Sequence, residues 1–172
     1  VYPDTLSEKF IHLLKTNEKL MPHLHVSIQS LDDKVLSLMK RKYNAEFVVN
    51  LLTGIQKEVP EIAVTADLIV GFPQEEEENF LNTFENIKKI SFSDFHIFPY
   101  SDRENTAAAQ LSGKIDQKIK KDRVKRLEKI KAEKFLEFKK NILNTAQKVY
   151  IEEIKSDKAY GYTENYLKVE IK

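Results

Sequence analysis

The sequence predicts an α/β protein in which helices flank a parallel sheet, followed by a small antiparallel β segment. Two patterns predict this fold. Three apolar, strand-like segments alternate with amphipathic, helix-like segments, which is the βαβ order typical of parallel sheets. After a last long helix, the pattern changes to short alternating segments of the kind that form antiparallel strands.

The first predicted strand covers residues 24–29, where apolar and polar side chains alternate. Such a strand buries one face and leaves the other face polar. A helix is predicted directly after it, with Asp32 or Asp33 as the N-cap. The apolar residues at helical spacing in this segment are Val35, Leu38 and Met39.

A second helix is predicted after Asn44, because apolar residues recur there on one stripe until Pro60 ends the pattern. The stripe consists of Val48, Leu51, Leu52, Ile55 and Val59. Residues 62–70 then form an almost continuous β-branched and apolar run. That run is typical of a strand covered on both faces in a parallel sheet, and Gly71 to Pro73 stop it.

An acidic run, Glu75 to Glu78, complements the positive end of a third helix, which is followed by a strand from Phe92 to Tyr100. Residues 101–113 are predicted to form a loop with one helical turn at 107–111. A long helix is then expected to end near Asn144.

Beyond that helix, residues 149–151 and 166–171 alternate like antiparallel strands around a turn-prone segment, Lys158 to Asn165. Two or three strands cannot close a barrel, so this segment reads as the opening of an incomplete β domain. The predicted division is therefore 1–113 for the sheet and its helices, 114–145 for the long helix and 146–172 for the β segment.

Composition limits the chemistry available to this chain. It has no cysteine, which excludes disulfides, thiolate metal ligands and a cysteine nucleophile. No signal peptide or long apolar run is present, which favours a cytoplasmic protein without a membrane partner. Residues 114–140 are rich in lysine and arginine, and they either face a phosphate backbone or form an ordinary solvated helix face.

In parallel α/β architectures ligands bind beyond the carboxyl ends of the strands, so the residues that end each strand are the candidate site. These residues are Ser27, Gln29 and Ser30, then Asp67, Gly71 and Phe72, then His96, Tyr100, Asp102 and Arg103. Because glycine has no Cβ, Gly71 is expected to let a ligand approach the backbone. The alternatives are that Gly71 only makes a turn and that the polar residues face a solvated layer.

His23 and His25 have the alternate spacing that places two imidazoles on one face of a strand. No third ligand or spaced carboxylate accompanies them in the sequence, and His12 and His96 stand alone, so packing or hydrogen bonding is the preferred interpretation. No metal site is predicted. No catalytic triad, phosphate loop or zinc signature is present either.

Five phrases in this sequence resemble the radical S-adenosylmethionine (SAM) methylthiotransferases. They are Pro22 to Ser30, Met39 to Tyr43, Asp67 to Pro73, Tyr100 to Arg103 with Thr106 to Ala108, and Gly161 to Tyr166, the last similar to the opening of the RNA-binding TRAM domain. The resemblance spans nearly the whole chain. It is greatest for the branch that methylthiolates threonylcarbamoyl-adenosine in tRNA, with the isopentenyl-adenosine and ribosomal-protein branches as alternatives.

The resemblance implies an enzyme with S-adenosylmethionine and two 4Fe-4S clusters. The cysteines that hold both clusters would lie N-terminal to this chain, in a missing N-terminal half of the same protein. This chain would then supply the second half of a radical SAM barrel, a partial TIM-type barrel, with its closing helix and the start of the TRAM domain. Such a fragment would be inactive alone, and its partner would be tRNA.

The resemblance also implies roles for individual residues. Those implied to bind S-adenosylmethionine are Ser27, Gln29, Ser30, Arg41, Asp67, Gly71 and Phe72. Those implied to bind the substrate or RNA are Tyr100, Arg103, Thr106, Thr163 and Asn165. Arg41 would pair with the cofactor carboxylate, Tyr100 would stack on a base and Arg103 would meet phosphate. No catalytic residue and no metal ligand is assigned within this chain.

The sequence departs from the family pattern at the strand ends. Leu31, Gln74 and Glu104-Asn105 replace residues that are usually glycine or a Pro-Gly pair, and Met21 stands where cysteine is common. These larger residues are expected to reshape the loops that contact the cofactor. Two other functions stay open: a non-enzymatic RNA-binding module, and an unrelated α/β enzyme that binds a phosphorylated metabolite.

Overall fold

The computed structural model describes residues 1–172 and contains a three-stranded parallel sheet in the order β1, β2, β3. The strands are β1 (His23–Gln29), β2 (Ala63–Val70) and β3 (Phe92–Pro99). The helices are α1 (Glu8–Thr16), α2 (Asp33–Leu38), α3 (Ala45–Glu58), α4 (Glu77–Lys89) and α5 (Gln117–Ile142). Short 3₁₀ turns cover Pro3–Thr5 and Ala107–Gln110. The predicted α/β fold with a parallel sheet is confirmed.

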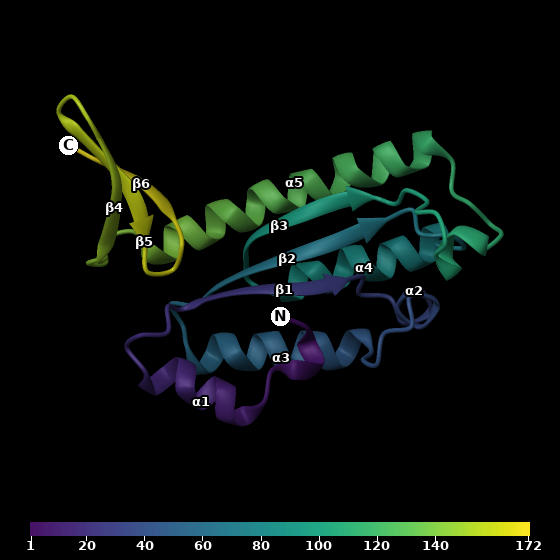
Figure 1. The fold of residues 1–172 in the computed structure, drawn as a ribbon, viewed down its shortest axis with the longest axis horizontal. Coiled ribbons are helices and arrows are strands. Elements are labelled where there is room, and N and C mark those ends of the chain that lie inside the picture. Colours follow the sequence, from purple (N-terminus) through teal and green to yellow (C-terminus); the bar gives the residue numbers. More distant parts are fainter.

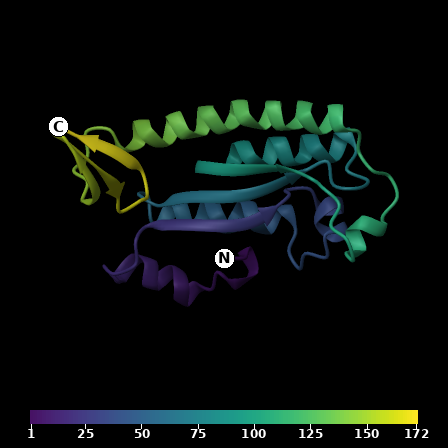
Figure 2. The ribbon, with the colours of Figure 1, turned by 45° about the horizontal axis from the view of Figure 1, so that its top comes forward.

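One face of this sheet is covered by helices and the other is not. Figures 1 and 2 show α3, α4 and α5 behind and beside the strands, while the face turned toward the viewer in Figure 1 carries no helix. Alternate residues of the strands, such as Val26, Leu68 and Phe95, are completely buried toward the helices. The intervening residues, including His25 and Asp67, are only partly buried on the open face.

Local sequence signals explain where the helices begin. The carboxylate of Asp32 accepts a hydrogen bond from the Val35 amide at 2.9 Å and caps α2. The side chain of Asn44 caps α3 by accepting from the Phe47 amide at 2.8 Å. Helix α1, which was not predicted from the sequence, begins in the same way, because the Ser7 side chain accepts a hydrogen bond from the amide of Phe10.

Helix α5 packs along β3 through few residues. Only Lys120, Arg123, Leu127 and Ile130 of this helix are buried, and they recur at spacings that place them on one face. Two of the four are charged and therefore need partners. Arg123 pairs with the buried carboxylate of Glu75 at 2.8 Å, and the Lys120 ammonium donates to the Tyr100 carbonyl at 2.9 Å.

The C-terminal residues form a separate antiparallel sheet of β4 (Val149–Lys155), β5 (Lys158–Thr163) and β6 (Lys168–Ile171). The prediction of a turn over Lys158 to Asn165 is wrong for most of that segment, since residues 158–163 are the central strand. The turn before β5 is made by Ser156 and Asp157, with Ser156 in the left-handed region at φ 54°. Alternating tyrosines favour the strand instead.

Gly161 is required where β5 passes β4. A Cβ built on it would lie 2.0 Å from the carbonyl oxygen of Tyr150. We expect Gly161→Ala to destabilise the C-terminal sheet by about 1–3 kcal/mol, because the strands must separate. Hydrogen exchange of the β4 and β5 amides measures this loss.

The matched control for that change is Gly54→Ala in α3, where no atom lies within 4 Å of an added Cβ. Alanine should leave α3 unchanged or stabilise it by up to about 1 kcal/mol, since glycine is a weak helix former. Equal protection of β4 and β5 in Gly161→Ala and in the unmodified protein would contradict the prediction.

Candidate functional site

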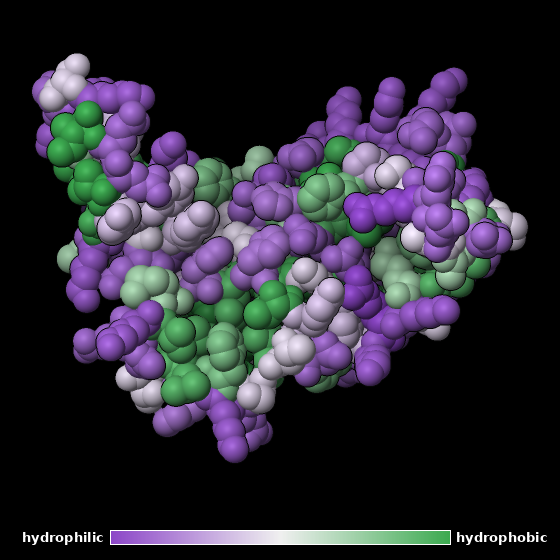
Figure 3. Space-filling model, viewed as in Figure 1, coloured by the Kyte–Doolittle hydropathy of each residue, from purple (hydrophilic) through white to green (hydrophobic).

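The open face of the sheet carries most of the polar strand residues. His25, Asp67 and His96 lie on the three neighbouring strands β1, β2 and β3. Asp67 is in register with His96, and His25 is in register with Thr65, two residues before Asp67, so the three side chains lie close together on the same face. Figure 3 shows hydrophilic residues over the middle of this face and hydrophobic ones nearer the N-terminus. A parallel sheet with one bare polar face offers its side chains to a ligand.

A cavity of about 480 Å³ lies at the carboxyl ends of the strands. Its lining consists of Gln29, Asp67, Ile69, Phe98, Pro99, Tyr100, Ser101, Arg103, Thr106 and Ala108. Five of the residues predicted from the sequence therefore come together here: Gln29, Asp67, Tyr100, Arg103 and Thr106. The volume is that of a small-molecule site.

Tyr100 is held at the edge of this cavity. Its hydroxyl donates to Asp102 at 3.0 Å, and its ring meets the edge of the Phe72 ring, with centroids 5.1 Å apart. Desolvation and the bond to Asp102 raise the pKa of Tyr100 above its usual range, so the phenol stays protonated at neutral pH. Lys114 donates to Asp102 and lowers the pKa of that carboxyl.

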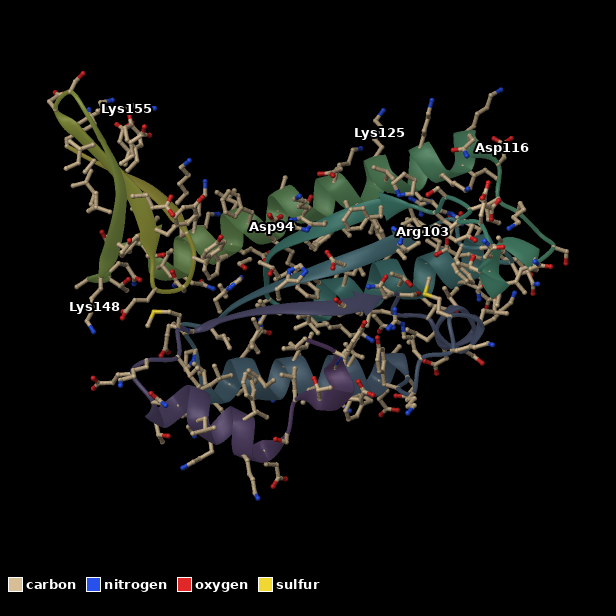
Figure 4. The ribbon with its side chains drawn as sticks, in the orientation of Figure 1. Asp94, Arg103, Asp116, Lys125, Lys148 and Lys155 are labelled. Carbon is tan, nitrogen blue, oxygen red and sulfur yellow. The ribbon has the colours of Figure 1, made fainter.

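Arg103 follows on the loop beyond β3, near the carboxyl ends of β2 and β3 in Figure 4. Its carbonyl accepts from the Thr106 hydroxyl at 2.8 Å, which fixes the loop backbone. The guanidinium is exposed and has no hydrogen-bond or ion-pair partner in the structure. It is therefore available to an anionic group of a ligand.

The other seven predicted site residues lie outside the cavity lining, and four of them surround the strand ends without entering it. Ser27 is partly buried on the open face of β1, and its carbonyl accepts from the Tyr43 hydroxyl at 3.2 Å. Ser30 is fully buried and bonds to the Thr83 hydroxyl at 3.1 Å. Phe72 does not line the cavity but packs against the Tyr100 ring, which does. Arg41 stacks over the Tyr2 ring, and its Nε is buried without a hydrogen-bond partner.

The space beside Gly71 is occupied by protein. Gly71 has φ +73°, and an added Cβ would lie 2.3 Å from Cγ of Lys120. The expected reason for this glycine, close approach of a ligand, is therefore corrected: the stem of Lys120 fills the space that a side chain would need. Gly71 contributes to the site by allowing α5 to dock beside Tyr100.

The two predicted RNA-binding residues of the C-terminal sheet are buried. Thr163 and Asn165 are 5% and 1% exposed. The Thr163 hydroxyl donates to the Asn165 side chain at 2.5 Å, and the Asn165 amide donates to the Glu61 carbonyl at 3.4 Å. Their direct contact with RNA stays a prediction, and their burial does not favour it. Asn165 instead anchors this sheet to the residues before β2, and Thr163 holds the Asn165 side chain.

The interpretation of the histidines needs correction. His25 Nε2 lies 3.0 Å from one carboxylate oxygen of Asp67, and His96 Nδ1 lies 3.3 Å from the other. A carboxylate does accompany His25, and His96 does not stand alone, because strand pairing brings His25, Asp67 and His96 together. The prediction from the sequence was wrong on both points. His23 instead bonds to Thr65 at 3.2 Å, and burial together with the nearby His25 lowers its pKa. Only the shared alternation of polar residues on the three strands could have signalled this cluster.

A parallel sheet of three strands, helices on one face and a polar cavity at the carboxyl ends define a partial α/β barrel of the enzyme type. The Radical SAM superfamily model matches residues 1–87, and the chain belongs to that superfamily. The predicted resemblance to this family is confirmed. None of the helices combines the length and apolar character needed to cross a membrane.

The similar curated proteins are tRNA-modifying enzymes by name. The chain is 37% identical to the threonylcarbamoyladenosine tRNA methylthiotransferase of Bacillus subtilis, over 97% of this chain and 38% of that protein. It is 38% identical to the protein of that name in Aquifex aeolicus, over 95% of this chain and 39% of the relative. It is 36% identical to the tRNA-2-methylthio-N(6)-dimethylallyladenosine synthase of Endomicrobium trichonymphae, over 98% of this chain and 40% of the relative. The chain thus spans about two fifths of the length of these relatives.

A solved structure supports the fold. The archaeal Methanocaldococcus infernus Elp3 with an N-terminal deletion superposes with a TM-score of 0.52 at 19% identity, over 91% of this chain and 34% of that chain. The polar lining at the strand ends fits a nucleoside-containing cofactor, because it offers a carboxylate, a guanidinium, an amide and aromatic rings. An iron–sulfur cluster needs thiolate ligands, and this chain has no cysteine to supply one.

Proposed function

We propose that this chain is the strand-end and RNA-facing part of a tRNA methylthiotransferase that modifies threonylcarbamoyl-adenosine. The observation that carries the proposal is the convergence of Gln29, Asp67, Tyr100, Arg103 and Thr106 on one cavity, in a chain similar to enzymes of that name over nearly its whole length. Residues 1–113 would form the barrel part, 114–145 the closing helix and 146–172 the first strands of the RNA-binding domain.

The proposed division of labour follows from the chemistry of the side chains. S-adenosylmethionine, with clusters held by cysteines outside this chain, would supply the radical and the sulfur. The Gln29 amide would bind the ribose or the amino acid end of the cofactor. Arg41 would pair with the cofactor carboxylate, an interaction that a guanidinium can make in bidentate fashion. Because Arg41 lies outside the lining of the strand-end cavity, this role requires the cofactor to extend beyond that cavity. Tyr100 would stack on the substrate base and Arg103 would bind phosphate.

A basic stripe on α5 supports tRNA as the partner. Four exposed lysines share one face of the helix and make no ion pair: Lys118, Lys121, Lys125 and Lys129. Lys125 points away from the sheet in Figure 4. Several lysines on one face can neutralise phosphates together, and binding of that kind weakens steeply with salt.

A graft tests the proposed function directly. The matching segment of the Bacillus subtilis relative is replaced by this chain, and the chimera is expressed in a strain that lacks its own enzyme. Mass spectrometry of tRNA nucleosides should then show the methylthio form of threonylcarbamoyl-adenosine. A folded, cluster-loaded chimera that consumes no S-adenosylmethionine and modifies no tRNA would refute the enzyme, and salt-sensitive tRNA binding alone would favour the RNA-binding module.

The second candidate substrate is dimethylallyl-adenosine, the isopentenyl-adenosine of the other branch, since a synthase of its methylthio form is 36% identical to this chain. A reciprocal graft into the Endomicrobium trichonymphae relative separates the two. If this chain selects the nucleoside, both chimeras will modify the same adenosine. If each chimera keeps the substrate of its host, the choice is made elsewhere.

Arg103→Ala in the active chimera is expected to raise the KM for tRNA roughly tenfold or more, because a hydrogen bond from a charged donor contributes about 1.5–3 kcal/mol. Initial rates at several tRNA concentrations measure this. Lys57→Ala is the matched control, since Lys57 is an exposed cation at the end of α3 and does not line the strand-end cavity. Equal KM values for Arg103→Ala and Lys57→Ala would remove Arg103 from the site.

A further inference from the structure

Three side chains from three strands meet on the open face of the sheet. The nearest nitrogen atoms of His25 and His96 and an oxygen of Asp67 all lie within 4.8 Å of one another. Asp67 lies between the two imidazoles, with one oxygen toward each. The three side chains are 39%, 56% and 23% exposed for His25, His96 and Asp67, so the cluster is accessible from the open face.

The contacts of Thr65 concern the tautomer of His25, that is, which of its two ring nitrogens carries the proton. The Thr65 hydroxyl has one proton, and three groups lie within its reach: His25 Nδ1 at 2.9 Å, His23 Nε2 at 3.2 Å and the Leu24 carbonyl at 3.3 Å. The neutral His25 ring has two tautomers here: with the proton on Nε2 it donates to Asp67 at 3.0 Å and accepts from Thr65, and with the proton on Nδ1 it donates to Thr65 and turns the Nε2 lone pair toward Asp67. A metal ion on Nε2 would select the second tautomer, because a ligating nitrogen carries no proton.

We propose that His25 Nε2, His96 Nδ1 and Asp67 bind one divalent transition-metal ion, with zinc as the simplest occupant. A tetrahedral zinc with bonds of about 2.0–2.1 Å holds its ligands about 3.3 Å apart. The two imidazole–carboxylate separations, 3.0 and 3.3 Å, match this spacing, whereas the three ligand atoms as a set lie within 4.8 Å of one another, so binding would draw the two imidazoles together. With a metal on Nε2, His25 Nδ1 would donate to Thr65, 2.9 Å away, and this would be the outer-shell contact that orients a ligating histidine. Two imidazoles and one carboxylate suit zinc, cobalt or ferrous iron, whereas magnesium and calcium prefer oxygen ligands.

The surroundings leave room for a fourth ligand. His25 and His96 line a hollow of about 810 Å³ that extends to α5 and the C-terminal sheet. Asp67 also lines the cavity at the strand ends. A bound ion would therefore lie between two hollows, with its open position directed to water or to a small ligand. This inference rests on the cluster alone and is independent of the proposed methylthiotransferase function.

The test uses the 172-residue chain without a histidine tag, treated with a chelator and then titrated with zinc chloride in a calorimeter. One equivalent should bind. Cobalt(II) in place of zinc should give the intense visible absorption of a four-coordinate site. Because the chain has no cysteine, neither thiolate binding nor cluster assembly can contribute to either signal.

Variants locate the ion. His25→Gln and His96→Gln should each weaken zinc binding more than Thr65→Val does. Thr65→Val removes the outer-shell contact to His25, together with the hydroxyl's bonds to His23 and the Leu24 carbonyl, and should lower the affinity for zinc about 10- to 100-fold. His12→Gln, an exposed histidine on α1, is the matched control and should bind zinc like the unmodified chain. Circular dichroism verifies that each variant is folded. Asp67 is not replaced because it is the most buried of the three and its loss could disturb the sheet, so the more exposed His96→Gln is the decisive variant.

Two outcomes would overturn the proposal. One is that the unmodified chain binds no zinc, in which case a proton alone occupies the position between His25 and Asp67. The other is that a single zinc ion binds equally well to His25→Gln, His96→Gln and His12→Gln, which would place the metal elsewhere.

Discussion

Replacing Arg123 by alanine is expected to lower the free energy of unfolding by about 3–5 kcal/mol, because it leaves a buried carboxylate without its partner. The Arg123 and Glu75 side chains are 3% and 1% exposed and pair at 2.8 Å. Arg123 also donates to the Glu75 carbonyl at 2.9 Å. A loss of this size is a large share of the stability of a typical domain. Denaturant unfolding followed by circular dichroism measures it.

The neighbouring Arg126 is the matched control for Arg123. Its side chain is 30% exposed and pairs with the exposed carboxylate of Glu77 at 2.6 Å. A surface pair of this kind contributes about 1 kcal/mol or less, so Arg126→Ala should unfold almost like the unmodified protein. Similar unfolding free energies for Arg123→Ala and Arg126→Ala would show that the buried pair does not hold α5 in place.

The pH dependence of Arg123→Ala follows from Glu75. Burial raises the pKa of this carboxyl even with Arg123 present. Without Arg123, the folded state takes up a proton at a higher pH than the unfolded chain does. The stability of the variant should therefore increase as the pH falls through the raised pKa of Glu75 toward the ordinary value, because protonation removes the buried charge.

Leu127→Ala is expected to destabilise the protein by about 2–5 kcal/mol. Leu127 is fully buried in the main core, and Ile130 is the only other buried apolar residue of α5. Because α5 is a long polar helix with only two buried apolar residues, no other side chain can make up for the contacts that Leu127 loses. Hydrogen exchange of α5 and β3, together with denaturant unfolding, measures the loss.

The control for Leu127 lies on the same helix. Leu136 is 53% exposed, so Leu136→Ala should change the unfolding free energy by less than about 0.5 kcal/mol. If Leu127→Ala and Leu136→Ala gave the same unfolding curves, α5 would not depend on its apolar anchors. Detachment of α5 would also move Lys120 away from Gly71 and Tyr100, so the strand-end cavity depends on this helix for its shape.

The elements were predictable because their signals are local. Alternation of apolar residues indicates β1, the buried run indicates β2, and the caps Asp32 and Asn44 mark helix starts within three residues of the amides they bind. The meeting of Gln29, Asp67 and Tyr100 at one cavity was also predictable, because parallel strands present their carboxyl ends at the same edge. Helix α1 has a comparable N-cap at Ser7, so its start was also predictable although it was not predicted.

Local patterns in the sequence were enough to establish the α/β order of the elements, the cysteine-free chemistry and the residues available at each strand end. Tertiary structure alone decided that Asp67 lies between His25 and His96, that Lys120 fills the space beside Gly71, and that Thr163 and Asn165 are buried. The physical reason is the same in each case. These contacts join residues that are far apart in the chain, or they depend on how a whole sheet docks. Strand register and packing therefore determine them, and a local sequence pattern specifies neither.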